Sequence, residues 1–136
     1  PADAARTGGA ARLVARALEQ GVDIKQITIS SDGYGSQPVF NERQECIGIT
    51  YSRCNTVHDE LCRMVAAEHI PMEVALQTVT SNVADRMGLS GKKGLVAPGA
   101  DADLVVWDDG LHIKLVYARG KLAYSGGEPL LKGGFE

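Results

Sequence analysis

The chain has 136 residues, an apolar fraction of 44% and a formal net charge of −3. This length and composition suffice for one globular domain of ordinary size with a hydrophobic core. The acidic balance and the lack of a long run of Lys and Arg argue against a nucleic-acid-binding surface. No apolar run approaches the roughly 20 residues that a membrane-spanning helix needs, and no signal-peptide pattern is visible.

The three cysteines are Cys46, Cys54 and Cys62. They form neither a CxxC motif nor a paired Cys/His spacing, which argues against both a disulfide framework and a zinc knuckle. Their number is odd, and their individual roles are not indicated by the sequence. We therefore expect reduced thiols in a cytoplasmic protein.

The first part of the chain has the pattern of a helix followed by a strand. Apolar residues recur at helical spacing from Ala10 to Leu18, and Gly21 stands where a helix commonly stops. Residues 24–29 alternate in a way that predicts a strand ending at residues 30–32. From residue 36 to about residue 54 the periodicity is weak. We predict an irregular loop there, in which residues 47–50 are the candidate for a short strand.

The second part predicts helices followed by short strands. Thr56 is placed to cap a helix, and Pro71 closes that helix or opens the next one, which runs to about residue 78. A shorter helix follows and stops at Gly88. After Gly94 three short strands separated by tight turns are expected, at residues 104–107, 113–117 and 121–124. We predict the α/β end of a larger domain over residues 1–93 and part of a small β domain over residues 94–136.

The stretch "ITISSDGYGSQP", residues 27–38, places an aspartate directly after the predicted strand. In a parallel α/β barrel the functional side chains project from the C-terminal ends of the strands, so Asp32 is a candidate metal ligand or catalytic base. Gly33 and Gly35 would let the backbone curl tightly over a ligand, and Ser36 offers a hydroxyl and an amide. The alternative is an ordinary Asp-Gly turn. A dinucleotide-binding loop is disfavoured because a third glycine is missing.

A second stretch, "TSNVADRMGLSGKKGLVAPGADADLVVWD", spans residues 80–108. It resembles the C-terminal signature of the metal-dependent amidohydrolase superfamily, in which a helix ending in Gly-Leu leads to a Pro-Gly turn and an Ala-Asp-Leu-Val-Val strand. The resemblance implies that Asp103 holds a turn and takes no part in catalysis. The motif "ISSDGYGSQPVFNE" and the tail "VYARGKLAYSGGEPLLKGGFE" are similar to the isoaspartyl (β-aspartyl) dipeptidase branch of this superfamily.

This resemblance implies an α/β fold that is the C-terminal part of a TIM-like (β/α)8 barrel, with its last strand and following helices. It implies that Asp32 binds a metal and shuttles a proton. Ser36, with Gly33 and Gly35, would hold the substrate. The cofactor implied is zinc, as two ions in the complete enzyme, where they activate a hydroxide that attacks a small β-aspartyl dipeptide. A homo-oligomer is implied for the complete enzyme.

The other metal ligands of that family are not recognisable in this chain. The family requires a His-x-His pair, a modified lysine and two further histidines, whereas His58, His69 and His112 are scattered. A complete barrel has eight strand–helix units. We therefore expect that the N-terminal barrel portion is missing, that this chain alone binds no zinc, and that it is inactive alone. A non-catalytic interaction module and a cyclic-imide hydrolase are the alternatives.

Overall fold

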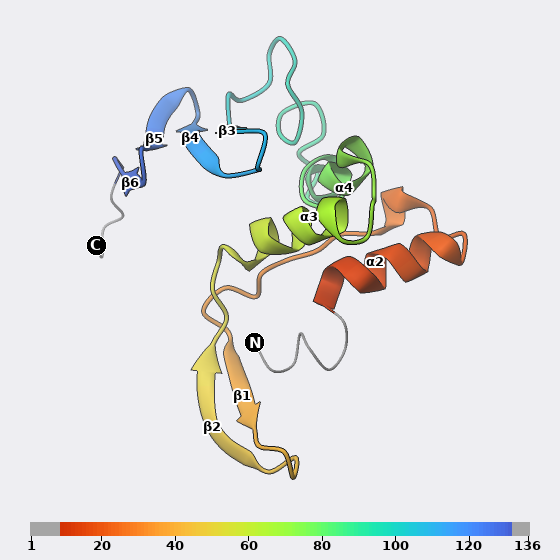
Figure 1. Ribbon diagram of the computed structural model, residues 1–136. Coiled ribbons are helices and arrows are strands. Elements are labelled where there is room, and N and C mark those ends of the chain that lie inside the picture. The colour runs from red at the N-terminus through yellow and green to blue at the C-terminus, as the bar shows by residue number, and fades with distance from the viewer. Residues whose placement is uncertain (1–8, 132–136) are drawn as a thin grey trace. The chain divides into compact units, whose positions relative to one another are not determined.

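The computed structural model describes residues 9–131 (Figure 1). Residues 1–8 and 132–136, which include the end of the tail motif, lie outside the described residues. The chain divides into two compact units, Pro1–Val83 and Ala84–Glu136. The boundary after residue 93 stays a prediction. The α/β class is confirmed, because helices and two antiparallel sheets are both present among the described residues.

Helices α2 (Gly9–Glu19) and α3 (Thr56–Ala66) lie side by side in the first unit (Figure 1). Their facing apolar side chains form the core, in which Val14, Leu61 and Met64 are buried. Glu60 of α3 also closes the start of α2, since its Oε2 accepts a hydrogen bond of 2.7 Å from the Ala11 amide. This bond satisfies one of the amides that a helix leaves without a partner in its first turn. The predicted first helix and the helix at Thr56 are confirmed.

The strand predicted at residues 24–29 is wrong. Ile24–Gln26 form a short 3₁₀ helix, η1, and Asp23 caps it by accepting a hydrogen bond of 3.0 Å from the Lys25 amide. The residues after η1 belong to no sheet among the residues that the structure describes. A strand needs a neighbouring strand to take up its backbone groups. Here Thr78, which lies in a turn, takes up part of that role, since the Ile29 amide donates to the Thr78 carbonyl at 3.1 Å.

The irregular loop predicted from residue 36 to about residue 54 is also wrong. It is largely a hairpin of two antiparallel strands, β1 (Ser36–Phe40) and β2 (Cys46–Tyr51), drawn side by side in Figure 1. Asn41 organises the turn, because its side-chain oxygen accepts hydrogen bonds from the Arg43 and Glu45 amides at 2.9 and 3.0 Å. The candidate strand at residues 47–50 is therefore real but is one half of a longer pair.

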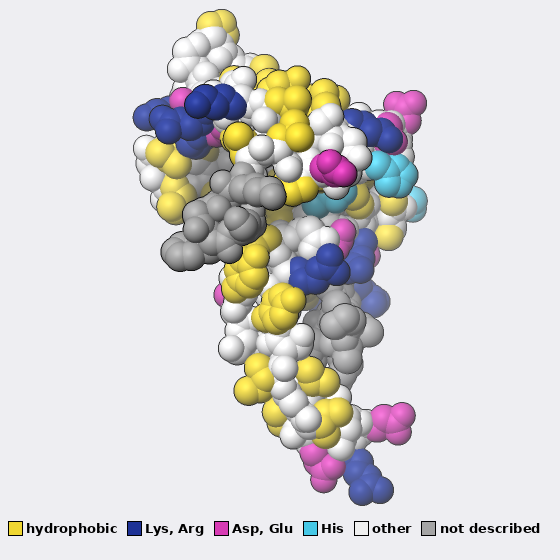
Figure 2. Space-filling model, turned by 90° about the vertical axis from the view of Figure 1, so that its left-hand side faces the viewer, with side chains coloured by type: hydrophobic (Ala, Val, Ile, Leu, Met, Phe, Trp, Pro, Cys, Tyr) yellow, Lys and Arg dark blue, Asp and Glu magenta, His cyan; other side chains and the backbone are white. Residues whose placement is uncertain are grey.

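One face of the hairpin exposes apolar side chains. Ile47, Ile49 and Tyr51 alternate along β2, and 64%, 77% and 62% of their surfaces are exposed. Figure 2 shows hydrophobic side chains along the hairpin in the lower part of the view. The regular alternation of apolar residues predicts that this face packs against another element, and no element within residues 9–131 buries it.

Two short helices follow α3 in the chain. Helix α4 (Met72–Gln77) begins after Pro71, and α5 (Ser81–Arg86) ends before Gly88, both close to the predicted positions. The second unit contains a four-stranded antiparallel sheet in the order β3-β4-β5-β6. Its strands are β3 (Leu104–Trp107), β4 (Ile113–Ala118), β5 (Lys121–Ser125) and β6 (Glu128–Pro129). The first three confirm the prediction, and the fourth was not anticipated. None of the helices in residues 9–131 combines the length and apolar character needed to cross a membrane.

Candidate functional site

Asp32 sits in a tight loop that leads directly into the hairpin. Asp32 and Tyr34 both have a positive φ, of 48° and 63°, which is uncommon for residues other than glycine. The Gly35 amide donates to the Asp32 carbonyl at 2.8 Å and closes the turn. Two more backbone bonds attach the loop to the end of β2, from the Tyr34 amide to the Ser52 carbonyl at 2.9 Å and from the Ser52 amide to the Gly35 carbonyl at 3.0 Å. The loop is therefore held to the end of the hairpin.

Both glycines of this loop are required by space. A Cβ atom at position 33 would lie 2.6 Å from the Sγ atom of Cys54. A Cβ atom at position 35 would lie 2.6 Å from Oδ2 and 2.8 Å from the carbonyl oxygen of Asp32. The substrate-binding role of Gly33 and Gly35 stays a prediction. The structure supplies a separate reason for them, because the loop packs too closely for side chains at these two positions.

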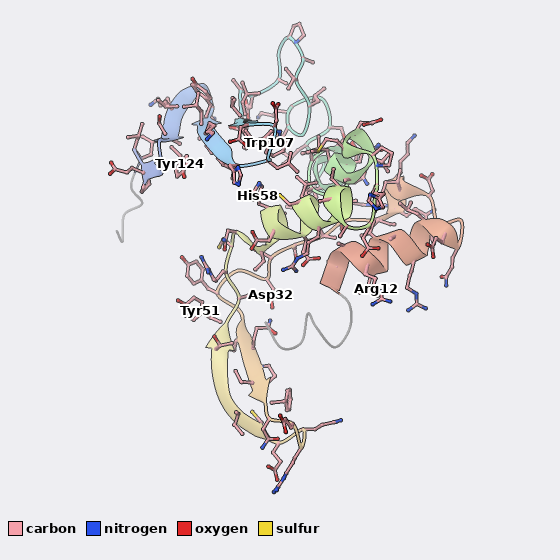
Figure 3. All side chains as sticks on the ribbon, in the orientation of Figure 1. Arg12, Asp32, Tyr51, His58, Trp107 and Tyr124 are labelled. Carbon is pink, nitrogen blue, oxygen red and sulfur yellow. The ribbon has the colours of Figure 1, made fainter. Side chains whose placement is uncertain are left out.

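The carboxylate of Asp32 is hydrogen-bonded within the chain. The side-chain amide of Gln37, on β1, donates to its Oδ2 atom at 3.3 Å. The ring of Tyr34 stacks on the ring of Tyr51, with centroids 6.2 Å apart and an interplanar angle of 20°. Figure 3 shows Asp32 and Tyr51 near the point where the loop meets the hairpin. The sequence places Gln37 in the same motif but assigns it no role in the site.

Ser36 is the first residue of β1 and pairs with Tyr51 across the hairpin. Its side chain is exposed, as is that of Asp32. Both are therefore accessible to a small molecule. The structure thus brings Asp32 into contact with Gly35 and with Gln37, and it places Ser36 at the start of the strand, between these two in the sequence.

The two sequence motifs meet at the segment that precedes Asp32. Asn82 of α5 is 3% exposed, and its side-chain amide donates to the carbonyls of Ile24 and Ile27 at 2.7 and 2.9 Å. Together with the bond from Ile29 to Thr78, these contacts join residues 24–29 to the start of the second motif. Both bonds lie in a partly buried environment, where carbonyl groups depend on such partners. Asn82, which is more than fifty residues away in the sequence, therefore holds the segment that leads to Asp32.

The described residues do not provide a complete metal site. A carboxylate oxygen is a suitable donor to zinc, so Asp32 fits as one ligand, but a zinc site requires three or four. Among residues 9–131 no three His, Cys, Asp or Glu side chains are grouped so that they could hold a metal ion. In this chain Asp32 therefore provides at most one ligand of such a site.

The turns of the second unit contain the clearest ionic cluster. The Nζ atom of Lys93 contacts Asp101 at 2.8 Å and also Asp103, whose Oδ1 accepts a hydrogen bond of 2.7 Å from the Arg119 amide. The hydrogen bonds to Asp101 and Asp103 raise the pKa of Lys93, and its ammonium group lowers the pKa of both aspartates. These contacts fit the turn-holding role expected of Asp103.

Two other groups in the described chain have shifted pKa values. The pKa of Asp108 is well below its ordinary value because its carboxylate accepts a hydrogen bond from the His112 amide and contacts the Lys114 ammonium. Burial, reinforced by the nearby charge of Asp59, raises the pKa of the Cys62 thiol. A raised pKa disfavours the thiolate, which is the nucleophilic form of cysteine.

Known proteins resemble the chain over most of its length. Human N-acetylglucosamine-6-phosphate deacetylase is 32% identical over an alignment of 135 positions, which covers 90% of this chain and 33% of the relative. A β-aspartyl dipeptidase from Fervidobacterium islandicum AW-1, solved with a β-Asp-Leu dipeptide, matches 93% of this chain with a TM-score of 0.78 and 26% identity, over 32% of its own length. The chain thus spans about a third of these proteins.

A third likeness concerns the fold alone. An N-acetylglucosamine-6-phosphate deacetylase from Pasteurella multocida matches 77% of this chain and 32% of its own length, with a TM-score of 0.60 and 14% identity.

The model of the amidohydrolase family matches residues 5–126, which include both sequence motifs and the whole candidate site. The chain belongs to the amidohydrolase family.

Proposed function

We propose that this chain supplies the catalytic carboxylate, Asp32, and part of the substrate site of a metal-dependent hydrolase that cleaves β-aspartyl dipeptides. The observation that carries this proposal is the structural match to a β-aspartyl dipeptidase over 93% of the chain. The accessible carboxylate of Asp32, in a loop that leads into the strand begun by Ser36, is consistent with this match, because a carboxylate is the kind of group that moves a proton in amide hydrolysis.

The residues of this chain would divide the work. Bound zinc ions would polarise the scissile carbonyl and lower the pKa of the attacking water. Asp32 would take the proton from that water and deliver it to the departing amine, which is the role of a general base and then a general acid. Ser36 would donate a hydrogen bond to a carboxylate of the substrate, and bonds to charged groups are the stronger ones.

A second specificity has its own support. The human deacetylase is 32% identical over 90% of this chain, and its substrate, like a dipeptide, contains an amide bond that is hydrolysed. The chemistry at Asp32 would be the same for both substrates. The substrates differ away from the amide, since one presents a phosphate and the other an amino group and carboxylates.

The experiment that tests the proposal compares two linkages in a protein that contains this chain together with the rest of the barrel. We expect hydrolysis of β-Asp-Leu and little hydrolysis of α-Asp-Leu, because the isomers place the scissile bond differently relative to the carboxylate held by the site. Removing metal with a chelator should abolish the activity, and adding zinc back should restore it. Equal rates for both isomers would contradict a β-aspartyl specificity.

Replacing Ser36 by alanine in that protein should chiefly raise the KM for β-Asp-Leu. Loss of a hydrogen bond to a charged group costs about 1.5–3 kcal/mol, which corresponds to roughly 10- to 150-fold in KM. Because Ser36 would act in binding, kcat should change little. Ser125, in the second sheet, is the matched control, and its replacement by alanine should leave both constants unchanged. A fall in kcat at constant KM would contradict a binding role for Ser36.

The chain expressed on its own should bind no stoichiometric zinc. One carboxylate cannot replace the three or four donors of a stable site, and no group of three potential ligands exists within residues 9–131. The measurement is elemental analysis of the chain after purification without chelators. One tightly held zinc ion per chain would contradict the statement that this chain provides at most one ligand of the zinc site.

A further inference from the structure

The carboxylate of Asp32 is folded back over its own loop. With φ at 48°, Asp32 starts a turn that the Gly35 amide closes by donating to the Asp32 carbonyl. The place of a Cβ atom at position 35 is 2.6 Å from Oδ2 and 2.7 Å from Cγ of Asp32. A Cβ atom essentially never makes non-bonded contacts this short, so a side chain at position 35 would require the Asp32 carboxylate or the loop to shift. The φ of Gly35 is not in the left-handed region, so the restriction concerns space alone.

A second contact fixes the same carboxylate from the hairpin. The side-chain amide of Gln37 donates to Oδ2 at 3.3 Å. Gln37 is half-buried, whereas Ser36 and Pro38 on either side of it are exposed. It pairs with Thr50 in the ladder between β1 and β2, so its backbone belongs to the sheet. The donor is therefore held by the hairpin and the acceptor by the loop.

Backbone hydrogen bonds hold the loop and the hairpin together. The two backbone bonds between Ser52 and the loop residues Tyr34 and Gly35 connect them directly. Within the described residues, the Asp32 carboxylate accepts the bond from Gln37 through Oδ2, and the structure shows no hydrogen bond to Oδ1. A carboxylate that is bonded through one oxygen keeps the other available to bind a metal ion or to take a proton.

We infer that Gln37 is a positioning residue that, with the space left by Gly35, fixes the orientation of the Asp32 carboxylate and reserves Oδ1 for the reaction. This inference rests on the proposed function, in which Asp32 moves the proton. It assigns Gln37 a role that acts through Asp32 and requires no contact with the substrate. Preorganised groups of this kind raise the rate of the chemical step and leave binding unchanged.

The test uses the protein that contains this chain and the rest of the barrel, with β-Asp-Leu as substrate. Gln37→Met keeps the length of the side chain and removes the donor. We expect kcat to fall about tenfold, the lower end for a hydrogen bond to a charged group, at constant KM and constant zinc content. Thr50→Val, which changes the residue opposite Gln37 without touching the carboxylate, should keep the wild-type kcat.

A double-mutant cycle separates positioning from a general effect on the hairpin. If Gln37 acts only through the charged carboxylate, Gln37→Met should have little further effect in the Asp32→Asn background. An equal tenfold loss in both backgrounds would overturn the inference and assign Gln37 to the stability of the hairpin. A raised KM at constant kcat would overturn it in favour of a substrate contact.

The position of the Asp32 carboxylate in a crystal structure tests the role of Gln37 without an activity assay. In a crystal structure of the Gln37→Met protein, the Asp32 carboxylate should have left its place over Gly35, and Gly35→Ala should displace it in the same way. An unmoved carboxylate in Gln37→Met would overturn the inference. Failure of the wild-type protein to hydrolyse β-Asp-Leu would instead overturn the proposed function, while a displaced carboxylate would still support the positioning.

Discussion

Replacing Asp32 by asparagine should lower kcat for β-Asp-Leu by at least ~10²–10⁴-fold, the range typical of a lost general base. Asparagine has the size of aspartate and an oxygen that can still accept the hydrogen bond of Gln37, so the loop should keep its structure. It lacks the negative charge and the basicity that proton transfer requires. The measurement is steady-state kinetics in the protein that contains the whole barrel, with zinc content determined for each sample.

Asp23→Asn is the matched control for that experiment. Asp23 caps η1 through its side-chain oxygen, and asparagine is an equally good cap, so kcat and zinc content should match the wild-type values. Near wild-type kcat in a zinc-replete Asp32→Asn protein would contradict the catalytic role. The "SSDG" stretch would then be an ordinary turn, the alternative that its composition also allows.

Replacing Asn82 by alanine should lower the free energy of unfolding by about 1–3 kcal/mol, the usual cost of a lost partner for a buried polar group. The change removes the side-chain donor to the partly buried carbonyls of Ile24 and Ile27, of which the Ile24 carbonyl still accepts a hydrogen bond from the Ile27 amide. The effect should be visible as a lower midpoint of urea denaturation at an unchanged slope. Because the same bonds support the segment that leads to Asp32, we also expect kcat to fall in the complete protein.

Two further variants show whether the hydrogen bonds carry this effect. Asn82→Asp keeps the shape but removes the amide donors, and it should be at least as destabilising as Asn82→Ala. Asn55 is an exposed asparagine whose side chain makes no capping hydrogen bond to α3. Asn55→Ala should therefore shift stability by less than about 0.5 kcal/mol, as is usual for surface positions. Equal effects at positions 82 and 55 would contradict the supporting role of Asn82.

The parts of the fold that the sequence predicts are those set by local patterns. The helix from Thr56 and the strand Leu104–Trp107 follow from helical spacing and from a short apolar run between turns. The strand at residues 24–29 was wrong because alternation alone cannot supply the neighbouring strand that a ladder needs. In its place, η1 and the amide of Asn82 take up those backbone groups.

The hairpin was missed for an identifiable reason. Pro38 weakens a strand pattern, because proline cannot donate to a ladder and is confined to edge strands, which is where β1 lies. The alternation of Ile47 and Ile49 was the available signal, and it predicts a short strand at residues 47–50 within a loop. Alternation of apolar residues predicts one buried face of a strand, whereas the side chains of Ile47, Ile49 and Tyr51 are exposed in the described chain.

The candidate site divides in the same way. Asp32 and Ser36 could be proposed from the sequence, because the motif that contains them is continuous. The contact between Gln37 and Asp32 could not, since it depends on the hairpin that holds the amide over the loop. The support from Asn82 also depends on tertiary packing, because it crosses more than fifty residues of sequence.

The most direct test of the account compares two amide substrates in one protein. The protein that contains this chain and the rest of the barrel, loaded with zinc, is assayed with β-Asp-Leu and with N-acetylglucosamine-6-phosphate, and kcat/KM is measured for each. We predict a kcat/KM for β-Asp-Leu that is at least about a hundredfold higher, because a site built to bond one set of polar groups strongly rejects a substrate that lacks them. A higher kcat/KM for N-acetylglucosamine-6-phosphate would contradict the proposed dipeptidase function and assign the chain to a deacetylase.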